Sequence, residues 1–172
     1  NMAIVRIPPH NTEAEQAVLG SLLIDKEAIS EVSEVITPDY FYEGINKDIY
    51  DSMLQLFEER KPIDILTLTD ILKNKKLYQK VGGAGYLSSL ANVVPTAANV
   101  MHYARIMRER YIRRVMISLG AELTDLAFSE DVEANEIINR AEQGIFKLSS
   151  DQIKSGFIHI KEIYKSVLSD PK

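Results

Sequence analysis

The fold is decided by the stretch NVMHYARIMRERYIRRVMISLGAELTDL, which runs from Asn99 to Leu126. It contains no proline, and its one glycine, Gly120, rarely ends a helix by itself. The sequence therefore predicts one long helix from about residue 97 to about Phe128. Five arginines lie within it: Arg105, Arg108, Arg110, Arg113 and Arg114. They raise the question whether this helix binds nucleic acid or is a structural helix with a basic surface.

The apolar residues of this helix lie on different faces in its two halves, because successive residues are 100° apart around the axis. The first half has an apolar face made of Val100, Tyr103, Ala104, Met107 and Tyr111. The second half has an apolar seam made of Ile112, Met116, Leu119, Leu123 and Leu126. Since the apolar face swings by more than a quarter turn near Tyr111, we expect the first half to pack on the preceding residues. The seam should pack on a returning helix and on another chain.

The arginines then mark the solvated sides of a helix whose buried face changes its partner. Few aromatic residues alternate with them, which weakens the case for a surface that stacks single-stranded bases. The chain as a whole has a net charge of −5, so any basic patch is local. A solvated structural face is the favoured interpretation, and a basic-helix module that binds nucleic acid is the alternative.

Before this helix, residues 1–95 predict a head of short helices. Thr12 and Glu15 have the spacing of a capping box, and Asn46 is a candidate cap for a later helix. Tyr40 and Phe41, in a break between helices, are expected to fill a core.

Residues 96–149 predict a long antiparallel helical hairpin, and the fold class is all-α. Residues 150–172 are expected to form a polar linker and a C-terminal amphipathic linker helix. The apolar stripe of this helix has the spacing i, i+3, i+4, i+7 and i+8: Ile160, Ile163, Tyr164, Val167 and Leu168. The stripe either folds back on the hairpin or, as we favour, docks onto another subunit or domain.

Several chemical functions have no support in the sequence. There are no cysteines, and the histidines His10, His102 and His159 do not have metal-ligand spacing. The glycines of VGGAGYLSSL, from residue 81, are not followed by the Gly-Lys-Ser/Thr of a phosphate loop, so we interpret them as a turn. No apolar run approaches the length of a membrane span, and no secretion signal is apparent. A cytoplasmic, non-catalytic domain without its own cofactor is expected.

Several stretches together resemble the N-terminal domain of the bacterial replicative DNA helicase, the DnaB family. They are IPPHNTEAEQAVLGSLL from residue 7, DYFYEGINKDIYDSMLQLFEERKPIDILTLTDIL from residue 39, VGGAGYLSSLANVVPTAANVMHYARIMRER from residue 81 and AEQGIFKL from residue 141. GFIHIKEIY, from residue 156, resembles the linker helix of that family. No single motif is diagnostic, but their order and spacing match over nearly the whole chain.

The resemblance implies an assembly and interaction domain for DNA replication. In the family, hairpins pair into dimers, and three dimers form the collar of a hexameric ring that encircles DNA. The ATP- and Mg-dependent motor domain would follow the linker, so this chain would lack the helicase activity of its parent. The family also recruits primase through the collar and grips a neighbouring motor domain with the linker helix. A helicase loader is a further candidate partner.

Matching positions suggest four residues that contact primase: Glu13, Tyr86, Ile117 and Leu123. Each has a structural alternative except Ile117. Glu13 can serve the helix N-terminus, Tyr86 can belong to the core, and Leu123 can belong to hairpin packing. Ile117 lies on the polar side of the long helix, where a large apolar residue has no explanation within the chain.

Overall fold

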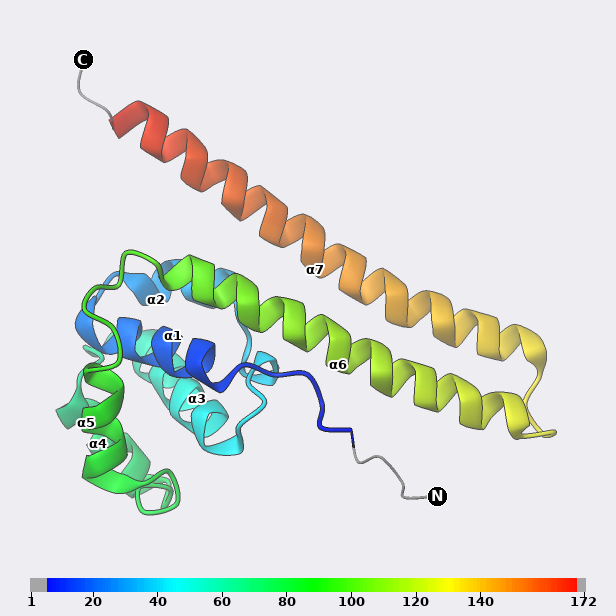
Figure 1. Ribbon diagram of the computed structural model, residues 1–172, viewed down its shortest axis with the longest axis horizontal. Helices are drawn as coiled ribbons and strands as arrows, with labels where there is room; N and C mark the ends of the chain where they lie inside the picture. The colour runs from blue at the N-terminus through cyan, green and yellow to red at the C-terminus, as the bar shows by residue number, and fades with distance from the viewer. Residues whose placement is uncertain (1–5, 170–172) are drawn as a thin grey trace. The chain divides into compact units, whose positions relative to one another are not determined.

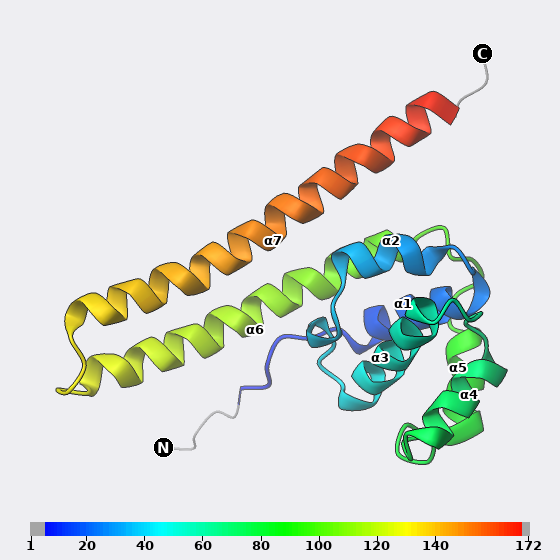
Figure 2. The same cartoon turned by 180° about the vertical axis from the view of Figure 1, so that it is seen from behind.

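A computed structural model describes residues 6–169, apart from the side chains of residues 152–159 and 162. Every regular element in this range is a helix, which confirms the all-α prediction (Figures 1 and 2). The elements are α1 (Thr12–Ile24), α2 (Ala28–Val35), the short 3-10 helix η1 (Pro38–Tyr40), α3 (Gly44–Glu58), α4 (Ile65–Asn74), α5 (Gly83–Ala91), α6 (Val100–Phe128) and α7 (Ala134–Ser169). The chain divides between Tyr111 and Ile112 into two compact units, which we call the head and the hairpin unit.

The head has a core of large apolar side chains contributed by most of its helices. Those with the least exposure include Leu19, Leu22, Ile36, Ile49, Tyr50, Met53, Leu68, Leu72, Leu87, Leu90 and Met107. Tyr40 and Phe41 are also buried, as predicted for the break between helices. The buried Tyr50 hydroxyl donates a hydrogen bond of 2.6 Å to the carbonyl oxygen of Ile36, and burial raises the pKa of this phenol.

The first half of α6 belongs to the head. Val100, Ala104 and Met107 are buried there, as predicted from their spacing. The ring of Tyr111 stacks on that of Tyr40, with the ring centroids 4.2 Å apart. A head boundary at residue 95 was therefore too early, because the apolar face of α6 continues the head core as far as Tyr111.

The hairpin unit consists of the second half of α6, a short turn and α7. The two helices lie side by side next to the turn (Figures 1 and 2). A linker break near residue 150 was wrong, because α7 is helical without interruption from Ala134 to Ser169. The polar residues of this segment are compatible with a helix, and its single glycine, Gly156, costs only about 1 kcal/mol relative to alanine.

Candidate interaction surfaces

The head contains a chain of hydrogen bonds that starts at a buried carboxylate. Glu15 is 1% exposed, and its carboxylate accepts hydrogen bonds from the backbone N–H groups of Tyr42 and Glu43 at 2.9 and 3.2 Å. The side-chain amide of the buried Asn46 donates a third, at 3.2 Å. These donors lie at the start of α3, where backbone N–H groups have no partner within the helix. Glu15, from α1, therefore holds the N-terminus of α3.

This arrangement corrects two predictions about helix caps. The cap of α1 is Asn11 rather than Thr12, since the Asn11 side chain accepts from the N–H of Ala14 at 2.9 Å. Glu15 reaches α3 instead of the backbone of its own helix. Asn46 was also wrong as a cap, because it lies inside α3 and uses its side chain to bind Glu15. For Glu15 and Asn46 the prediction preferred partners close in sequence, whereas their actual partners lie on another helix or at its start.

Tyr86 is half-buried at the far end of the same chain of hydrogen bonds. Its hydroxyl donates to the Asn46 side-chain oxygen and accepts from the Gln16 amide at 3.4 Å. Burial is the main cause of the raised pKa of this phenol, while the hydrogen bonds with Gln16 and Asn46 oppose the rise. Tyr86 thus connects α5 with α1 and α3, and part of its surface is left accessible to a partner.

Glu13 lies at a shallow groove of about 390 Å³ on the head. The side chain is exposed in the first turn of α1, a favourable position for a carboxylate at a helix N-terminus. Gln16 lines the same groove and also donates a hydrogen bond to the Tyr86 hydroxyl, whereas Tyr86 itself does not line the groove. The apolar part of the lining consists of Ala14, Ala17, Val93, Val94 and Ile106, with the ring of Tyr103 beside them.

In the hairpin unit, Leu119 is the one buried side chain among those described. Leu119 packs against Gly144 of α7. A Cβ added at Gly144 would lie 2.7 and 2.9 Å from the two methyl carbons of Leu119. Of the other seam residues, Ile112, Leu123 and Leu126 are half-buried and Met116 is 46% exposed. The predicted seam is therefore only partly covered within its own unit. Gly144 was missed, although a glycine inside a helical apolar pattern is a signal of close packing.

An ion pair also joins the two helices of the hairpin. The Arg140 guanidinium donates two hydrogen bonds to the Glu122 carboxylate, at 2.6 and 2.7 Å. This pairing lowers the pKa of Glu122 and raises that of Arg140. Both side chains are solvent-exposed, so the pair orients the helices more than it stabilises them.

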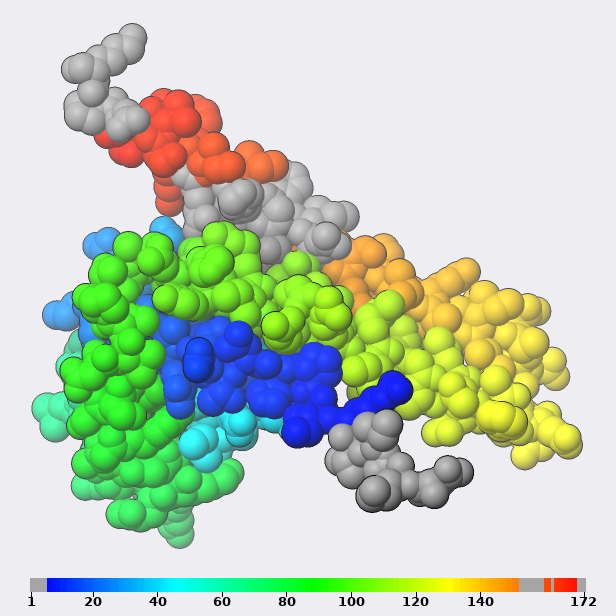
Figure 3. All heavy atoms as spheres, in the orientation of Figure 1, coloured from blue at the N-terminus to red at the C-terminus, as the bar shows by residue number. Residues whose placement is uncertain are grey.

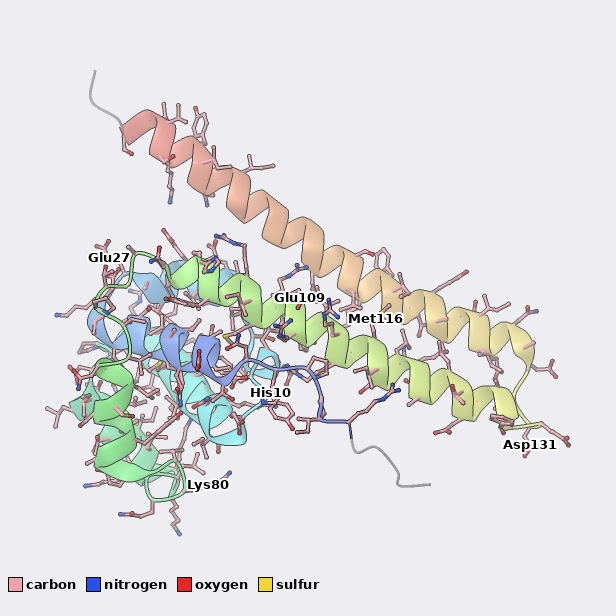
Figure 4. The ribbon with its side chains drawn as sticks, in the orientation of Figure 1. His10, Glu27, Lys80, Glu109, Met116 and Asp131 are labelled. Carbon is pink, nitrogen blue, oxygen red and sulfur yellow. The ribbon has the colours of Figure 1, made fainter. Side chains whose placement is uncertain are left out.

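Ile117 and Leu123 differ in accessibility. Ile117 is 57% exposed, as expected for a residue on the polar side of α6, whereas Leu123 is half-buried. In Figure 4 Met116, the neighbour of Ile117, is labelled on α6. Large apolar residues of α7 are also exposed, namely Ile138, Ile145 and Phe146.

The stripe of the linker helix lies at the end of α7 and is open to solvent. Its members Ile160, Ile163, Tyr164, Val167 and Leu168 are between 51% and 67% exposed. Five exposed apolar residues at helical spacing form a continuous face, and such faces mark interaction sites.

The arginines of α6 are not one continuous free stripe. Arg110 pairs with Glu109 at 2.8 Å, and Arg113 and Arg114 also have interaction partners. Arg105 and Arg113 are exposed, whereas Arg108, Arg110 and Arg114 are half-buried. This distribution agrees with a solvated structural face.

Within the described residues, no cluster of metal-ligating side chains is found, and none of the helices has the length and hydropathy needed to span a membrane.

Comparison with known proteins gives one consistent family. The sequence model described as DnaB-like helicase N terminal domain matches residues 7–109. Replicative DNA helicase DnaC of Bacillus subtilis (strain 168) is 38% identical over 158 residues, which are 92% of this chain and 35% of that protein. Replicative DNA helicase DnaB of Rhodothermus marinus is 37% identical over 163 residues, which are 95% of this chain and 17% of that protein. The chain thus spans about a third or less of these relatives.

Solved structures similar to this chain come from the same family. The crystal structure of the N-terminal domain of DnaB helicase from Mycobacterium tuberculosis matches with a TM-score of 0.77 at 34% identity, over 82% of this chain and 99% of that one. A structure described as that of a DnaB-like replicative helicase and its interactions with primase matches with a TM-score of 0.68 at 23% identity. That match covers 94% of this chain and 38% of the other, and it is a likeness of fold.

Proposed function

This chain belongs to the family of DnaB-like helicase N-terminal domains, and on that premise we propose that it is the assembly and interaction domain of a hexameric replicative DNA helicase. In this proposal it pairs with a second copy through the hairpin, contributes to a collar of three dimers and recruits primase in the bacterial cytoplasm. ATP-dependent unwinding, with its ATP and Mg, belongs to a motor domain outside this chain. DNA passes through the complete ring, and a helicase loader is a further partner.

The observation that carries the assembly role is the incomplete burial of the hairpin unit. Among its described side chains only Leu119 is buried, while Met116 and the exposed apolar residues Ile138, Ile145 and Phe146 of α7 keep between 45% and 73% of their surface accessible. Two helices alone bury few side chains between them, and helical bundles pack four helices around a shared core. A second hairpin packed on the seam supplies the missing pair.

The isolated chain is expected to self-associate through the seam. Met116→Asp should weaken that association by about tenfold or more, because each fully buried methionine contributes about 1.5–3 kcal/mol. Ser118→Asp adds the same charge at an exposed position on the other side of α6 and should leave association unchanged. Sedimentation equilibrium measures both. A strictly monomeric parent chain at high concentration would argue against the seam.

Support for primase recruitment comes from two places. In the head, Glu13 is exposed at a groove that Gln16 also lines, and Gln16 donates a hydrogen bond to the part-accessible Tyr86. In the hairpin unit, Ile117 is a large apolar side chain with 57% exposure. Leu123 is half-buried, so its role is split between hairpin packing and partner contact. The solvent-exposed stripe from Ile160 to Leu168 supports docking of the linker helix on a neighbouring motor domain.

Ile117→Asp is expected to weaken binding of the C-terminal domain of primase by about tenfold or more, since it replaces an exposed apolar contact with a charge. Isothermal titration calorimetry with that domain provides the affinity. Ser118→Asp is again the control, and circular dichroism should show the same helix content for both variants. An affinity unchanged from that of the parent would remove Ile117 from the primase surface.

A further inference from the structure

Glu15 determines the direction of the hydrogen bonds between itself and Tyr86. An ionised carboxylate can only accept, and the three hydrogen bonds described above all run to Glu15 from donors. The Asn46 side chain therefore has to turn its NH₂ group toward Glu15, because the opposite orientation would place the amide oxygen 3.2 Å from a carboxylate oxygen. Asn46 is completely buried, so water cannot replace either of its partners.

The orientation of Asn46 determines in turn the role of the Tyr86 hydroxyl. Since the NH₂ group of Asn46 faces Glu15, its oxygen faces Tyr86, and the phenol donates its hydrogen to that oxygen. The raised pKa of Tyr86 keeps the phenol protonated at neutral pH, so this hydrogen is present. A hydroxyl has only one hydrogen. Toward any group from outside the chain, Tyr86 can therefore act as an acceptor but not as a donor.

The acceptor capacity of the Tyr86 hydroxyl is only weakly used within the head. The Gln16 amide donates to it at 3.4 Å, whereas N–H···O hydrogen bonds are usually about 2.9–3.0 Å long. Tyr86 is also half-buried rather than enclosed, so part of its surface is accessible. A donor from a partner can thus form a shorter hydrogen bond with this oxygen than Gln16 does.

The charges around Tyr86 favour a donor that is also a cation. The two charged groups that shift its pKa at a distance, Glu15 and Glu43, are both carboxylates, and both raise the pKa. The lysines closest to Asn46 and Tyr86 in sequence, Lys47 and Lys80, are already paired with aspartates at 3.0 and 2.8 Å.

The two helices that carry this surface add carboxylates and no cation. Residues 7–25 and 81–104, which include α1 and α5, contain no lysine or arginine. Figure 3 shows α1 (blue) next to the green part of the chain that includes α5, and the two helices pack on one another. Glu13 lies three residues before Gln16, so both side chains lie on one face of α1. Glu13 is exposed and has no ion pair with a described residue.

We propose that the partner group that contacts Tyr86 is a positively charged hydrogen-bond donor, a lysine or arginine side chain, which donates to the Tyr86 hydroxyl. This inference rests on the proposed function, because it names the chemistry that the primase domain presents at this part of the head. Glu15 and Asn46 act from inside the head, since they keep the hydrogen of Tyr86 turned inward. A partner carboxylate or carbonyl oxygen would meet an oxygen without a hydrogen and is rejected.

The test reverses the direction of the outer hydrogen bond and keeps the inner one. 4-Aminophenylalanine in place of Tyr86 has two N–H hydrogens and a nitrogen lone pair that is drawn into the ring, so it can donate to Asn46 but accepts poorly. Isothermal titration calorimetry with the C-terminal domain of primase should show an affinity about tenfold lower than that of the parent chain. Tyr86→Phe, which removes the hydroxyl, should lose about as much. Thermal unfolding followed by circular dichroism checks that both variants are folded.

Tyr78→Phe is the matched control, because Tyr78 is another half-buried tyrosine of the head, and its ring lies under Lys73. It should bind like the parent. Raising the salt concentration should weaken binding of the parent by a larger factor than binding of the Tyr86→Phe chain, because the parent makes one more charged contact.

Four results overturn the inference. They are a 4-aminophenylalanine chain that binds as tightly as the parent, which indicates an acceptor on the partner, an unchanged affinity of Tyr86→Phe, an equal loss in Tyr78→Phe, and an equal salt dependence of parent and Tyr86→Phe. All four require that the parent binds, so they concern this inference alone. A parent chain that does not bind the primase domain would instead contradict the proposed function, and the assignment of a donor falls with it.

Discussion

Glu15→Gln is expected to lower the free energy of unfolding of the head by about 2–4 kcal/mol. The carboxylate accepts three hydrogen bonds from donors at the start of α3, and it is almost inaccessible to water. A glutamine side chain has the same shape, but one oxygen becomes an NH₂ group that faces another donor. At least one of the three hydrogen-bond donors then has no acceptor in a buried site. The negative charge of the Glu15 carboxylate, which is favourable at the N-terminus of α3, is lost as well.

Thermal unfolding followed by near-ultraviolet circular dichroism is the suitable measurement. Seven of the eight tyrosines lie in residues 1–111, and the chain has no tryptophan, so this signal reports on the head. Glu13→Gln is the matched control, because Glu13 lies on the same helix but is exposed. It should change stability by no more than about 0.5 kcal/mol. Equal effects of the two substitutions would contradict the role given to Glu15.

Gly20→Ala is expected to destabilise the head by about 3 kcal/mol or to prevent its folding. A Cβ built at Gly20 would overlap the carbonyl oxygen of Leu90, so α1 and α5 would have to move apart. A backbone oxygen cannot rotate away as a side chain can. The clash therefore exceeds the gain of about 1 kcal/mol that alanine brings to a helix interior.

Gly85→Ala is the control for this prediction. Gly85 lies within α5, one of the two helices concerned, and a Cβ there would meet nothing within 4 Å. The same substitution should stabilise the head by about 0.5–1 kcal/mol, so the two variants differ in the sign of their effect. Urea unfolding curves of both variants measure this difference. A Gly20→Ala protein as stable as the parent would mean that α1 and α5 are not in close contact.

Periodicity predicted the elements of this fold better than their connections. The change of apolar face near Tyr111 was visible in the spacing of residues along α6, and the chain divides at that point. Buried aromatic residues at 40 and 41 were also recognisable, because a break between helices that contains large apolar side chains has to place them somewhere. In contrast, the segment after residue 149 was mistaken for a linker, since polar residues and a glycine are compatible with either a loop or an exposed helix.

The partners of polar side chains were beyond the reach of the sequence. Glu15, Asn46 and Tyr86 are far apart along the chain, so their hydrogen bonds depend on how three helices pack. The two glycines at close contacts, Gly20 and Gly144, could be noticed in the sequence but not matched to Leu90 and Leu119. Exposure of Ile117, by comparison, followed from its angular position alone.

The continuity of α6 has a consequence for how this sequence can change over evolutionary time. A substitution at Val100, Ala104 or Met107 changes the packing of the chain's own core. A second substitution elsewhere in that core can compensate for it. Met116 is 46% exposed, so its own unit constrains it less, and under the proposed pairing a substitution there is tested against a second copy. If a second copy covers it, every mutation appears on both sides of the contact at once. Under the proposed pairing, the two halves of this helix would be subject to different selection, with the boundary at Tyr111.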